Sequence, residues 1–538
     1  MPRRADGRQA LDQRDAILIT YGDTFLAGDL RPLDALHRFA GSHLRGLVSS
    51  IHVLPFFPYS SDYGFAVIDY LEVDPRLGDW NQVSALGQDY RLMFDFVLNH
   101  VSAKSRWFKS FLAGEPPYDR FFITVDPKSD LSAVTRPRTT PLLTGFETAS
   151  GARWVWTTFG PDQVDLDYSN PEVLLRMVDV LLTYVERGAS LIRMDAIAYL
   201  WKQLGTSCVH LPQTHQVVKL FRDVLDLLAP QVLLVTETNV PHTENISYFG
   251  DGQDEAQLVY QFPLAPLVLD AFSRGDATRL AQWAASLSTP SAETAFFNFL
   301  ASHDGIGVVP AQGILSEDDI GRLAANVSRH GGEISRRSTP GGERPYELNA
   351  TWFDALSDPA AGEDPAVQRD RFLASQAIML ALAGVPGIYV HSLFGSHNDH
   401  GRYAESGWKR DLNHGRLELR DLAAELSDPE SQPAQVFAGM SRLLQARRST
   451  TAFHPKSPQQ VIQLGTTVFA LLRAASDGER VLALHNVAAA TATIPRARLE
   501  AAGWHGGGID LLSGRRMTVD RDLELRPYGI VWLHAQAS

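Results

Sequence analysis

The sequence has little cysteine, an excess of acidic charge and no long apolar run. Cys208 is the only cysteine in 538 residues, which excludes an intramolecular disulfide framework and a cysteine-clustered metal site. Lysine and arginine number 49 against 62 aspartates and glutamates, which gives a formal net charge of −13. Nucleic acids and anionic membranes bind basic surfaces, so this balance argues against both as partners.

The sequence also shows no pattern typical of a membrane-spanning or secretory segment. No apolar segment approaches the length that spans a membrane, and the first residues lack the apolar core of a secretory signal. Apolar residues make up 44% of the sequence, which is ordinary for a protein with a large buried core. We therefore expect a soluble, cytoplasmic protein, monomeric or homodimeric, whose partners are small molecules.

Short apolar runs alternate with longer helical patterns through most of the chain. Such near-continuous apolar strands indicate a parallel sheet that is buried on both faces. Seven or eight units favour an α/β fold of the (β/α)₈ TIM barrel type over an open doubly wound sheet. No glycine-rich phosphate loop follows the first run, which agrees with this choice. The clearest runs are residues 16–21, 46–54, 91–98, 190–195, 232–237, 296–300 and 387–390.

Three stretches break the alternation and suggest a division into domains. Residues 101–165 are rich in aromatics, proline and threonine, and they show no helical periodicity. Residues 328–349 are rich in glycine, arginine and serine and are typical of a long loop, within a wider loop region at 312–350. Short alternating runs after about residue 462 predict an antiparallel β domain. The expected parts are therefore barrel at 1–100, an insertion at 101–165, barrel again at 166–461 and a β domain at 462–538.

Acidic side chains follow several of the predicted strands. Asp195, Glu237 and Asp304 fall at or just after three strand ends, which meet at one mouth of a barrel. Glycosidic chemistry needs a pair of carboxyls, one as nucleophile or base and one as proton donor. Arg193 shares a strand face with Asp195 and favours its ionised form, which suits a nucleophile. Glu237 follows the apolar run VLLV, where burial raises the pKa of an acid/base group.

These residues resemble the four signature regions of glycoside hydrolase family 13, the α-amylase clan. The matching stretches are residues 95–100 (DFVLNH), 193–195 (RMD), 237 and 303–304 (HD). The resemblance implies a retaining barrel with an inserted domain B and a C-terminal β domain. It also implies that Asp195 is the nucleophile, Glu237 the acid/base and Asp304 the transition-state stabiliser. By the same resemblance, the glucose subsite is lined by Asn99, His100, Arg193 and His303.

A narrower resemblance is to the sucrose phosphorylase subfamily. It rests on residues 62–65 (DYGF), 136–138 (RPR), Phe159 with 163–165 (QVD), 205–208 (GTSC) and 303–308 (HDGIGV). That subfamily lacks the structural calcium that many α-amylases hold through an asparagine, so no metal or other cofactor is expected. Inorganic phosphate is then a co-substrate. The resemblance assigns sugar contacts to Asp62, Phe65, Phe159 and Gln163, and phosphate or acceptor contacts to Arg136, Arg138 and His330.

The predicted acceptor loop departs from the sucrose-specific pattern. Sucrose phosphorylases have Tyr-Gln where this chain has Tyr346 and Glu347, and an ionised glutamate accepts hydrogen bonds but cannot donate them. His414 stands where many relatives have an arginine, with Arg410 and Arg416 nearby. We include Tyr346, Glu347, His414 and Arg416 among the predicted substrate-binding residues. The arginine-rich loops suit an aglycone that carries negative charge.

The sequence therefore predicts a retaining α-glucoside phosphorylase, a glycosyltransferase-type enzyme of sucrose phosphorylase type. Sucrose 6′-phosphate is the expected substrate, ahead of sucrose, and α-glucose 1-phosphate is the expected product. Glucosylglycerate or glucosylglycerol is an alternative substrate. A hydrolase or transglucosidase with the same site stays open as a second alternative. A non-catalytic carbohydrate-binding protein is a third, although all three carboxyls are present.

Overall fold

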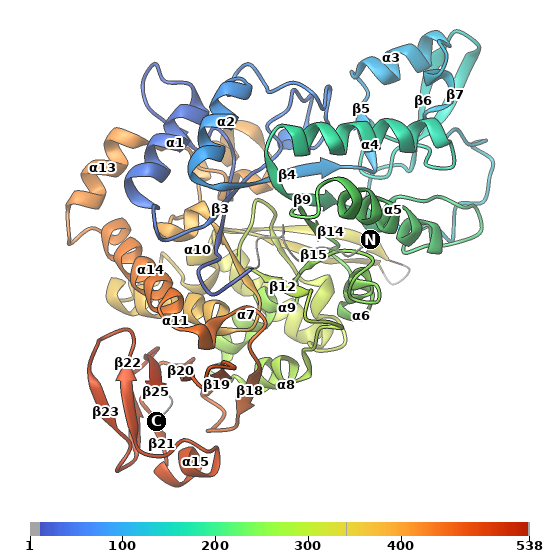
Figure 1. Cartoon of the computed structure of the whole chain (residues 1–538). Helices are drawn as coiled ribbons and strands as arrows, with labels where there is room; N and C mark the ends of the chain where they lie inside the picture. The colour runs from blue at the N-terminus through green and yellow to red at the C-terminus, as the bar shows by residue number, and fades with distance from the viewer. Residues whose placement is uncertain (1–10, 340–341, 536–538) are drawn as a thin grey trace.

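A closed barrel of eight parallel strands forms the centre of the computed structural model, which describes residues 11–339 and 342–535 (Figure 1). The strands are buried along nearly their whole length, as the apolar runs predict. The sixth strand was not predicted, because three residues are too few to show a pattern. In barrel order they are β1 (Ile17–Thr20), β3 (Ser50–Val53), β4 (Arg91–Val97), β9 (Ala189–Asp195), β10 (Leu233–Thr236), β11 (Leu258–Tyr260), β12 (Ala295–Asn298) and β16 (Val385–Tyr389).

Helices surround the barrel, and several of them begin at a proline. Proline suits the first helical position because its missing N–H has no partner there and its φ is already helical. α4 also has Asn170 as N-cap, whose side chain accepts from the Glu172 N–H at 3.1 Å. The main outer helices are α1 (Pro32–His43), α2 (Trp80–Asp89), α4 (Pro171–Glu186), α5 (Pro212–Leu228), α7 (Leu264–Arg274), α8 (Thr278–Ser286), α11 (Pro365–Ala381) and α14 (Gln432–Arg448).

The remaining helices are shorter or lie in the connections. They are α6 (His242–Asn245), α9 (Glu317–Arg329), α10 (Trp352–Leu356), α12 (His400–Ser406), α13 (Leu419–Ser427) and α15 (Arg496–Ala501). A small parallel pair joins β2 (Phe25–Leu26) to β17 (Leu417–Glu418). No helix among the described residues is long and apolar enough to cross a membrane.

An insertion between β4 and α4 contains two small antiparallel sheets, one α-helix and a short 3₁₀ helix (Tyr118–Arg120). β5 (His100–Ser102) pairs with β8 (Gln163–Asp165), and β6 (Leu143–Thr148) pairs with β7 (Gly151–Trp156). The expectation that this segment lacks helix is wrong, because α3 (Arg106–Ala113) lies within it. Its caps at Ser105 and Gly114 leave eight helical residues, too short a stretch for a periodicity to stand out.

The segment predicted as a long loop at 328–349 is mostly a β-hairpin. After α9, β14 (Glu333–Thr339) pairs with β15 (Gly342–Asn349), and β15 also pairs with the short β13 (Ile306–Gly307). The hairpin has few buried apolar residues, since its stabilisation comes from strand pairing and from buried polar groups at its base such as Glu347 and Asn349. An apolar alternation was therefore absent from the sequence.

The C-terminal part is an antiparallel β domain, as the alternating runs predict, and it lies far from the insertion (Figure 1). Its main sheet has the order β18 (Gln459–Ile462), β19 (Val468–Ala474), β20 (Arg480–Asn486), β25 (Ile530–Ala535), β22 (Gly507–Asp510) and β23 (Arg516–Thr518). A second pair joins β21 (Ala492–Ile494) and β24 (Leu523–Leu525).

Candidate active site

The carboxyl ends of the barrel strands bring the three predicted catalytic carboxyls to one narrow cavity of about 70 Å³. Asp195 ends β9, Glu237 directly follows β10, and Asp304 lies in the connection after β12. All three lie along the lining of this cavity. Other predicted residues that line it are Asp62, Phe65, His100, Arg138, Phe159, Gln163, His303, Tyr346 and Glu347.

Arg193 contacts two of these carboxyls, Asp195 and Glu237. Its Nη1 lies 3.0 Å from Oδ1 of Asp195 and its Nη2 lies 3.8 Å from Oε2 of Glu237, and the guanidinium is 1% exposed. Burial raises the pKa of both carboxyls. Because the direct Arg193 contact is with Asp195, we place the negative charge of the pair there and the proton on Glu237. That division suits a nucleophile beside an acid.

A second buried acid orients the arginine. Asp95 pairs with Arg193 and accepts a hydrogen bond from Nε2 of His52 at 2.7 Å. Although burial works in the other direction, Arg193 and His52 lower the pKa of Asp95 to about 2. Asp95 therefore remains a fixed anion beneath the site. His52 was missed by sequence reasoning, because a histidine within an apolar strand carries no signal of its partner.

The side of the cavity assigned to glucose is built from aromatic and polar groups. The Phe65 ring stacks on His303 with centroids 4.9 Å apart and an interplanar angle of 9°. Gln163 donates to Oδ2 of Asp62 at 3.1 Å and contacts Nε2 of His100 at 3.2 Å. Burial lowers the pKa of His303 to about 3, so its ring is neutral at pH 7. A flat apolar ring with polar groups around it suits a pyranose.

Arg410 is a site residue that sequence reasoning did not assign. It lies in the 3₁₀ helix Lys409–Asn413, with Nη1 at 2.7 Å from Asp304 and Nη2 at 3.0 Å from Oε1 of Glu347. Against the effect of burial, Arg410 keeps the pKa of Asp304 far below its usual range. Glu347 was expected to face the acceptor. Its carboxyl does lie in the cavity lining, where it is bound by Arg410, the same guanidinium that contacts Asp304.

Asn99 was predicted at the glucose subsite but lies behind the cavity. Lys202 donates to its Oδ1 at 2.5 Å, and the same ammonium lies 2.6 Å from Oδ2 of Asp165. Asn99 also donates to Asp165 at 3.0 Å. This buried cluster joins β8 of the insertion to the barrel. Asn99 therefore positions the insertion, and Lys202 supplies the positive charge between the two oxygen-bearing side chains.

Two predicted residues near residue 414 do not reach the cavity. His414 is buried and donates from Nε2 to the His303 carbonyl at 2.6 Å, and burial lowers its pKa to about 4. It thereby supports the loop that carries His303. Arg416 is half-exposed and pairs with Asp23 at 2.5 Å. Neither side chain therefore contributes to the cavity lining from the position where many relatives have an arginine.

Two of the predicted phosphate or acceptor residues also lie elsewhere. His330 caps α9 and hydrogen-bonds through Nδ1 to the Asp354 carbonyl at 2.8 Å. Arg136 is exposed and bonds the Thr140 carbonyl at 2.5 Å. Arg138, two residues further on, does line the cavity, with its Nη2 3.8 Å from Oδ2 of Asp62. Spacing alone could not tell which arginine of the RPR stretch turns inward.

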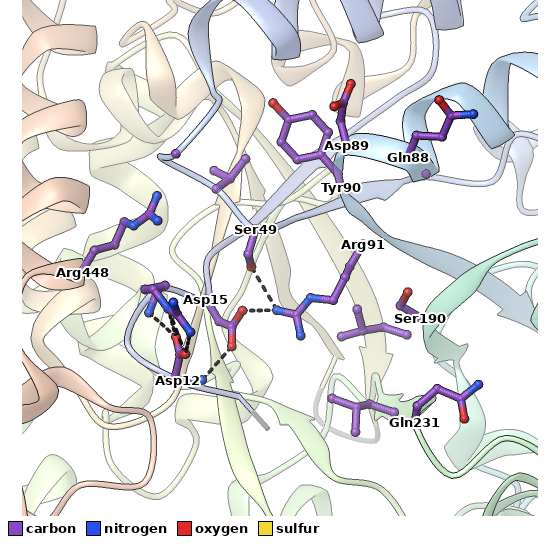
Figure 2. Close-up of a pocket in the computed structure, with 16 residues that line it drawn as sticks. Asp12, Asp15, Ser49, Gln88, Asp89, Tyr90, Arg91, Ser190, Gln231 and Arg448 are labelled. Carbon is purple, nitrogen blue, oxygen red and sulfur yellow. Dashed lines mark hydrogen bonds and ion pairs between the residues drawn. The ribbon is translucent and has the colours of Figure 1, made fainter. Parts of the chain in front are cut away.

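A larger cavity, of about 830 Å³, lies at the opposite end of the barrel, where the strands begin (Figure 2). Three arginines and three aspartates line it, so its charges balance, and some of them are paired: Arg91 bonds Asp15 and Ser49, and Arg14 bonds Asp12. Its lining has no excess of carboxyls over arginines. Its size therefore does not make it the reaction site.

The fold and the site together define a parallel barrel that brings the three predicted catalytic carboxyls to one narrow cavity. The chain belongs to the alpha-amylase family, whose catalytic domain matches residues 43–313. This confirms the resemblance to glycoside hydrolase family 13 and the predicted fold class.

Relatives narrow the class to phosphorylases. The chain is 54% identical to a glucosylglycerate phosphorylase of Allomeiothermus silvanus, over 86% of this chain and 84% of that protein. It is 43% identical to a glucosylglycerate phosphorylase of Escherichia coli, over 97% and 92%. A solved sucrose 6F-phosphate phosphorylase from Thermoanaerobacter thermosaccharolyticum has the same fold, with a TM-score of 0.77, 24% identity and coverage of 89% and 94%. The protein is an enzyme of this glycosyltransferase type.

Proposed function

We propose that this enzyme is a glucosylglycerate phosphorylase, which converts α-glucosylglycerate and phosphate to α-glucose 1-phosphate and glycerate. Two relatives with this name, at 54% and 43% identity, support the substrate. They favour it over sucrose 6′-phosphate, which the sequence placed first, since the solved enzyme acting on that sugar shares only 24% identity. Glucosylglycerate, the alternative substrate in the sequence analysis, is therefore the substrate that we now propose.

This proposal rests on which arginines of the cavity already have a carboxylate partner. Arg410 is held by Asp304 and Glu347, so its charge is already matched. Arg138 has only a loose contact with Asp62, at 3.8 Å, and its side chain is 32% exposed. One available guanidinium in a narrow cavity suits a small carboxylate better than a bulky hexose phosphate. The same group is available for phosphate after glycerate leaves.

The reaction then runs as two displacements. In the first, Asp195 attacks the anomeric carbon, the bond from that carbon to O2 of glycerate breaks, and Glu237 transfers its proton to that oxygen. In the second, a phosphate oxygen attacks the same carbon and displaces Asp195, while Glu237 takes up the phosphate's proton. Two inversions leave the product in the α configuration. Asp304, kept ionised by Arg410, stabilises positive charge at the anomeric carbon in both steps.

We also propose that the enzyme needs no calcium. Lys202 offers its ammonium to Asn99 and Asp165, the kind of oxygen groups that bind calcium. The lysine ammonium already lies between these two groups and neutralises the Asp165 carboxylate. It therefore occupies the space and balances the charge that a metal ion would need.

An acceptor panel tests the proposed function. The enzyme is incubated with α-glucose 1-phosphate and with glycerate, glycerol, fructose or fructose 6-phosphate, and phosphate release gives kcat/KM for each. We expect glycerate to exceed the others by at least roughly tenfold, the value of one charge-assisted contact. A preference for fructose 6-phosphate would restore the first prediction. In a control without any acceptor, water can take the glucosyl group and release free glucose. If glucose is released there as fast as phosphate is released with the best acceptor, the result would favour the hydrolase.

A further inference from the structure

Ala196, the residue directly after the nucleophile, has a backbone conformation that alanine seldom adopts. Its φ is 48° and its ψ is 32°, in the left-handed region. A Cβ makes this region unfavourable, and a strained residue of this kind persists only where the surrounding structure requires it. Ala196 also lines the cavity, and the chemistry described so far gives it no role.

The backbone N–H of Ala196 is directed at the side chain of the acid/base. It donates to Oε2 of Glu237 at 3.1 Å, and Nη2 of Arg193 lies 3.8 Å from the same oxygen. The Glu237 N–H in turn donates to the Met194 carbonyl at 3.2 Å, which fixes Glu237 against the end of β9. Among the described residues no donor contacts Oε1. The two carboxyl oxygens of Glu237 therefore have different surroundings.

We propose that the Ala196 N–H is a positioning group that keeps Oε2 of Glu237 as an acceptor and so places the catalytic proton on Oε1. The inference rests on the proposed function, because it takes Glu237 as the acid/base. In a neutral carboxyl group the carbonyl oxygen accepts hydrogen bonds well, whereas the hydroxyl oxygen is mainly a donor. A proton on Oε2 would leave the Ala196 N–H with the poorer acceptor, so the form with the proton on Oε1 is favoured.

Proton transfer then runs through one atom in both steps. In the first displacement the O–H bond at Oε1 breaks and the proton goes to O2 of glycerate, which leaves the anomeric carbon with the electron pair of the broken bond. In the second, Oε1 takes the proton of the phosphate oxygen that bonds to the anomeric carbon as Asp195 leaves. Because the proton already lies on the oxygen without a protein donor, the carboxyl group need not rotate to deliver it.

The same hydrogen bond contributes to the pKa of Glu237. Burial raises this pKa, and the Ala196 N–H opposes the rise because it stabilises the ionised carboxylate. Removing the N–H should therefore raise the pKa further. The charged groups that face Glu237 are those of Arg193, Asp195, Asp95 and Asp304, and the phenols that face it belong to Tyr199, Tyr260 and Tyr346. All of these stay unchanged in the variants below.

An amide-to-ester replacement at Ala196 tests the proposal, because it removes the N–H and keeps the methyl group. The full chain is made by cell-free synthesis with lactic acid in place of Ala196, which puts an oxygen where the N–H stands. Two rates are measured: kcat/KM on glucosylglycerate as a function of pH, and the first-turnover release of fluoride from α-glucosyl fluoride, a donor that needs no proton from Glu237.

The two donors should respond differently in the Ala196 ester. We expect kcat/KM on glucosylglycerate to fall by roughly tenfold, the value of one hydrogen bond to a group that ionises, and fluoride release to stay within about twofold of wild type. The alkaline fall of kcat/KM on glucosylglycerate should move to higher pH by about one unit, because the pKa of Glu237 rises and its protonated form is the active one.

Two variants of the same turn are matched controls. An ester at Leu200 removes the N–H that donates to the Ile197 carbonyl at 3.2 Å, a bond that does not involve Glu237. It should keep the wild-type ratio of the two donors and the wild-type alkaline fall. Ala196→Gly retains the N–H and reaches a φ of 48° without strain, so it should keep the same ratio and the same alkaline fall.

Selective loss on glucosylglycerate and an upward shift of the alkaline fall, both in the Ala196 ester and neither in the Leu200 ester, support the inference. An equal loss on the two donors, or an alkaline fall that stays in place, would overturn it, because the N–H would then serve only the structure of the turn. The proposed function fails on a different result. If Glu237→Gln loses activity equally on both donors, Glu237 is not the acid/base, and the inference falls with that assignment.

Discussion

The two ends of the barrel hold cavities that differ in size and in charge pairing. At the amino ends of the strands, the cavity of about 830 Å³ has arginines and aspartates that neutralise one another, as in Arg91 with Asp15 (Figure 2). At the carboxyl ends, the cavity of about 70 Å³ is lined by five carboxyl groups and two arginines. The smaller cavity is therefore the one with unbalanced charge.

This difference shows that charge imbalance, more than volume, marks the reaction site. Crowded buried carboxyls raise one another's pKa and cost stability, and folds keep such arrangements where chemistry needs them. Paired charges at the other end only stabilise the barrel. Substitutions at the carboxyl end should therefore change the chemistry, and substitutions at the amino end should change only the free energy of unfolding.

The largest effect is expected for Asp195→Ala. Without the nucleophile no glucosyl-enzyme forms, so phosphorolysis should fall by about four orders of magnitude or more. The melting temperature should stay the same or rise, because a buried carboxyl with a raised pKa is removed. Phosphate release and thermal unfolding are measured on the same preparation. Residual activity within tenfold of wild type would place the nucleophile elsewhere.

Glu237→Gln should show a loss that depends on the leaving group. Glycerate needs a proton to leave, so its transfer should slow by about 10²–10⁴-fold, whereas α-glucosyl fluoride should still glucosylate the enzyme. Because the pKa of Glu237 is raised and its protonated form is active, wild-type kcat/KM on glucosylglycerate should fall as the pH rises through that pKa. The variant should lack this alkaline fall. An equal loss on both donors would contradict the assignment.

Arg410→Met tests the charge link between the stabiliser and the acceptor strand. It leaves Asp304 and Glu347 as two buried carboxyls without their shared cation, so kcat should fall by about 10²–10³-fold. Adding Glu347→Gln removes one of the two and should recover part of the loss. Independent, additive effects of the two substitutions would show that Arg410 does not couple the two acids.

Several residues of the site could be predicted from the sequence because neighbouring residues determine where they lie. Asp195 and Glu237 lie next to the apolar strands that place them. The strand, its carboxyl end and the acidic residue there can therefore be predicted from one short stretch of sequence. Arg410 could not be assigned, since its contact with Asp304 joins positions 106 residues apart through the tertiary fold. The same holds for His330, whose sequence context suggests an acceptor loop but whose ring is bonded to Asp354. The hairpin was missed because polar strand pairing leaves no apolar period.

Lys202→Met should affect stability far more than turnover. The lysine and Asp165 are 4% and 0% exposed, and leaving that buried carboxylate without its cation should lower the free energy of unfolding by about 3–5 kcal/mol. The double variant Lys202→Met/Asp165→Asn should recover much of this loss.

A chelator should leave the wild-type melting temperature unchanged. A decrease that calcium reverses would refute the proposed independence from calcium.

The smallest effect on activity is expected at the amino end of the barrel, for Arg91→Met. Arg91 is 20% exposed and its partner Asp15 is 7% exposed, so the substitution leaves a mostly buried carboxyl with less compensation. Asp15 still accepts from the Asp12 N–H at 2.7 Å, which limits the loss of stability to about 1–3 kcal/mol. Adding Asp15→Asn should restore most of it, because the amide oxygen can keep that hydrogen bond. Throughout, kcat/KM for glycerate should stay within about twofold of wild type, since no group that touches substrate has changed. A loss of activity like that of Arg410→Met, with the fold intact, would show that the two ends of the barrel are coupled and that paired charge does not mark an inert cavity.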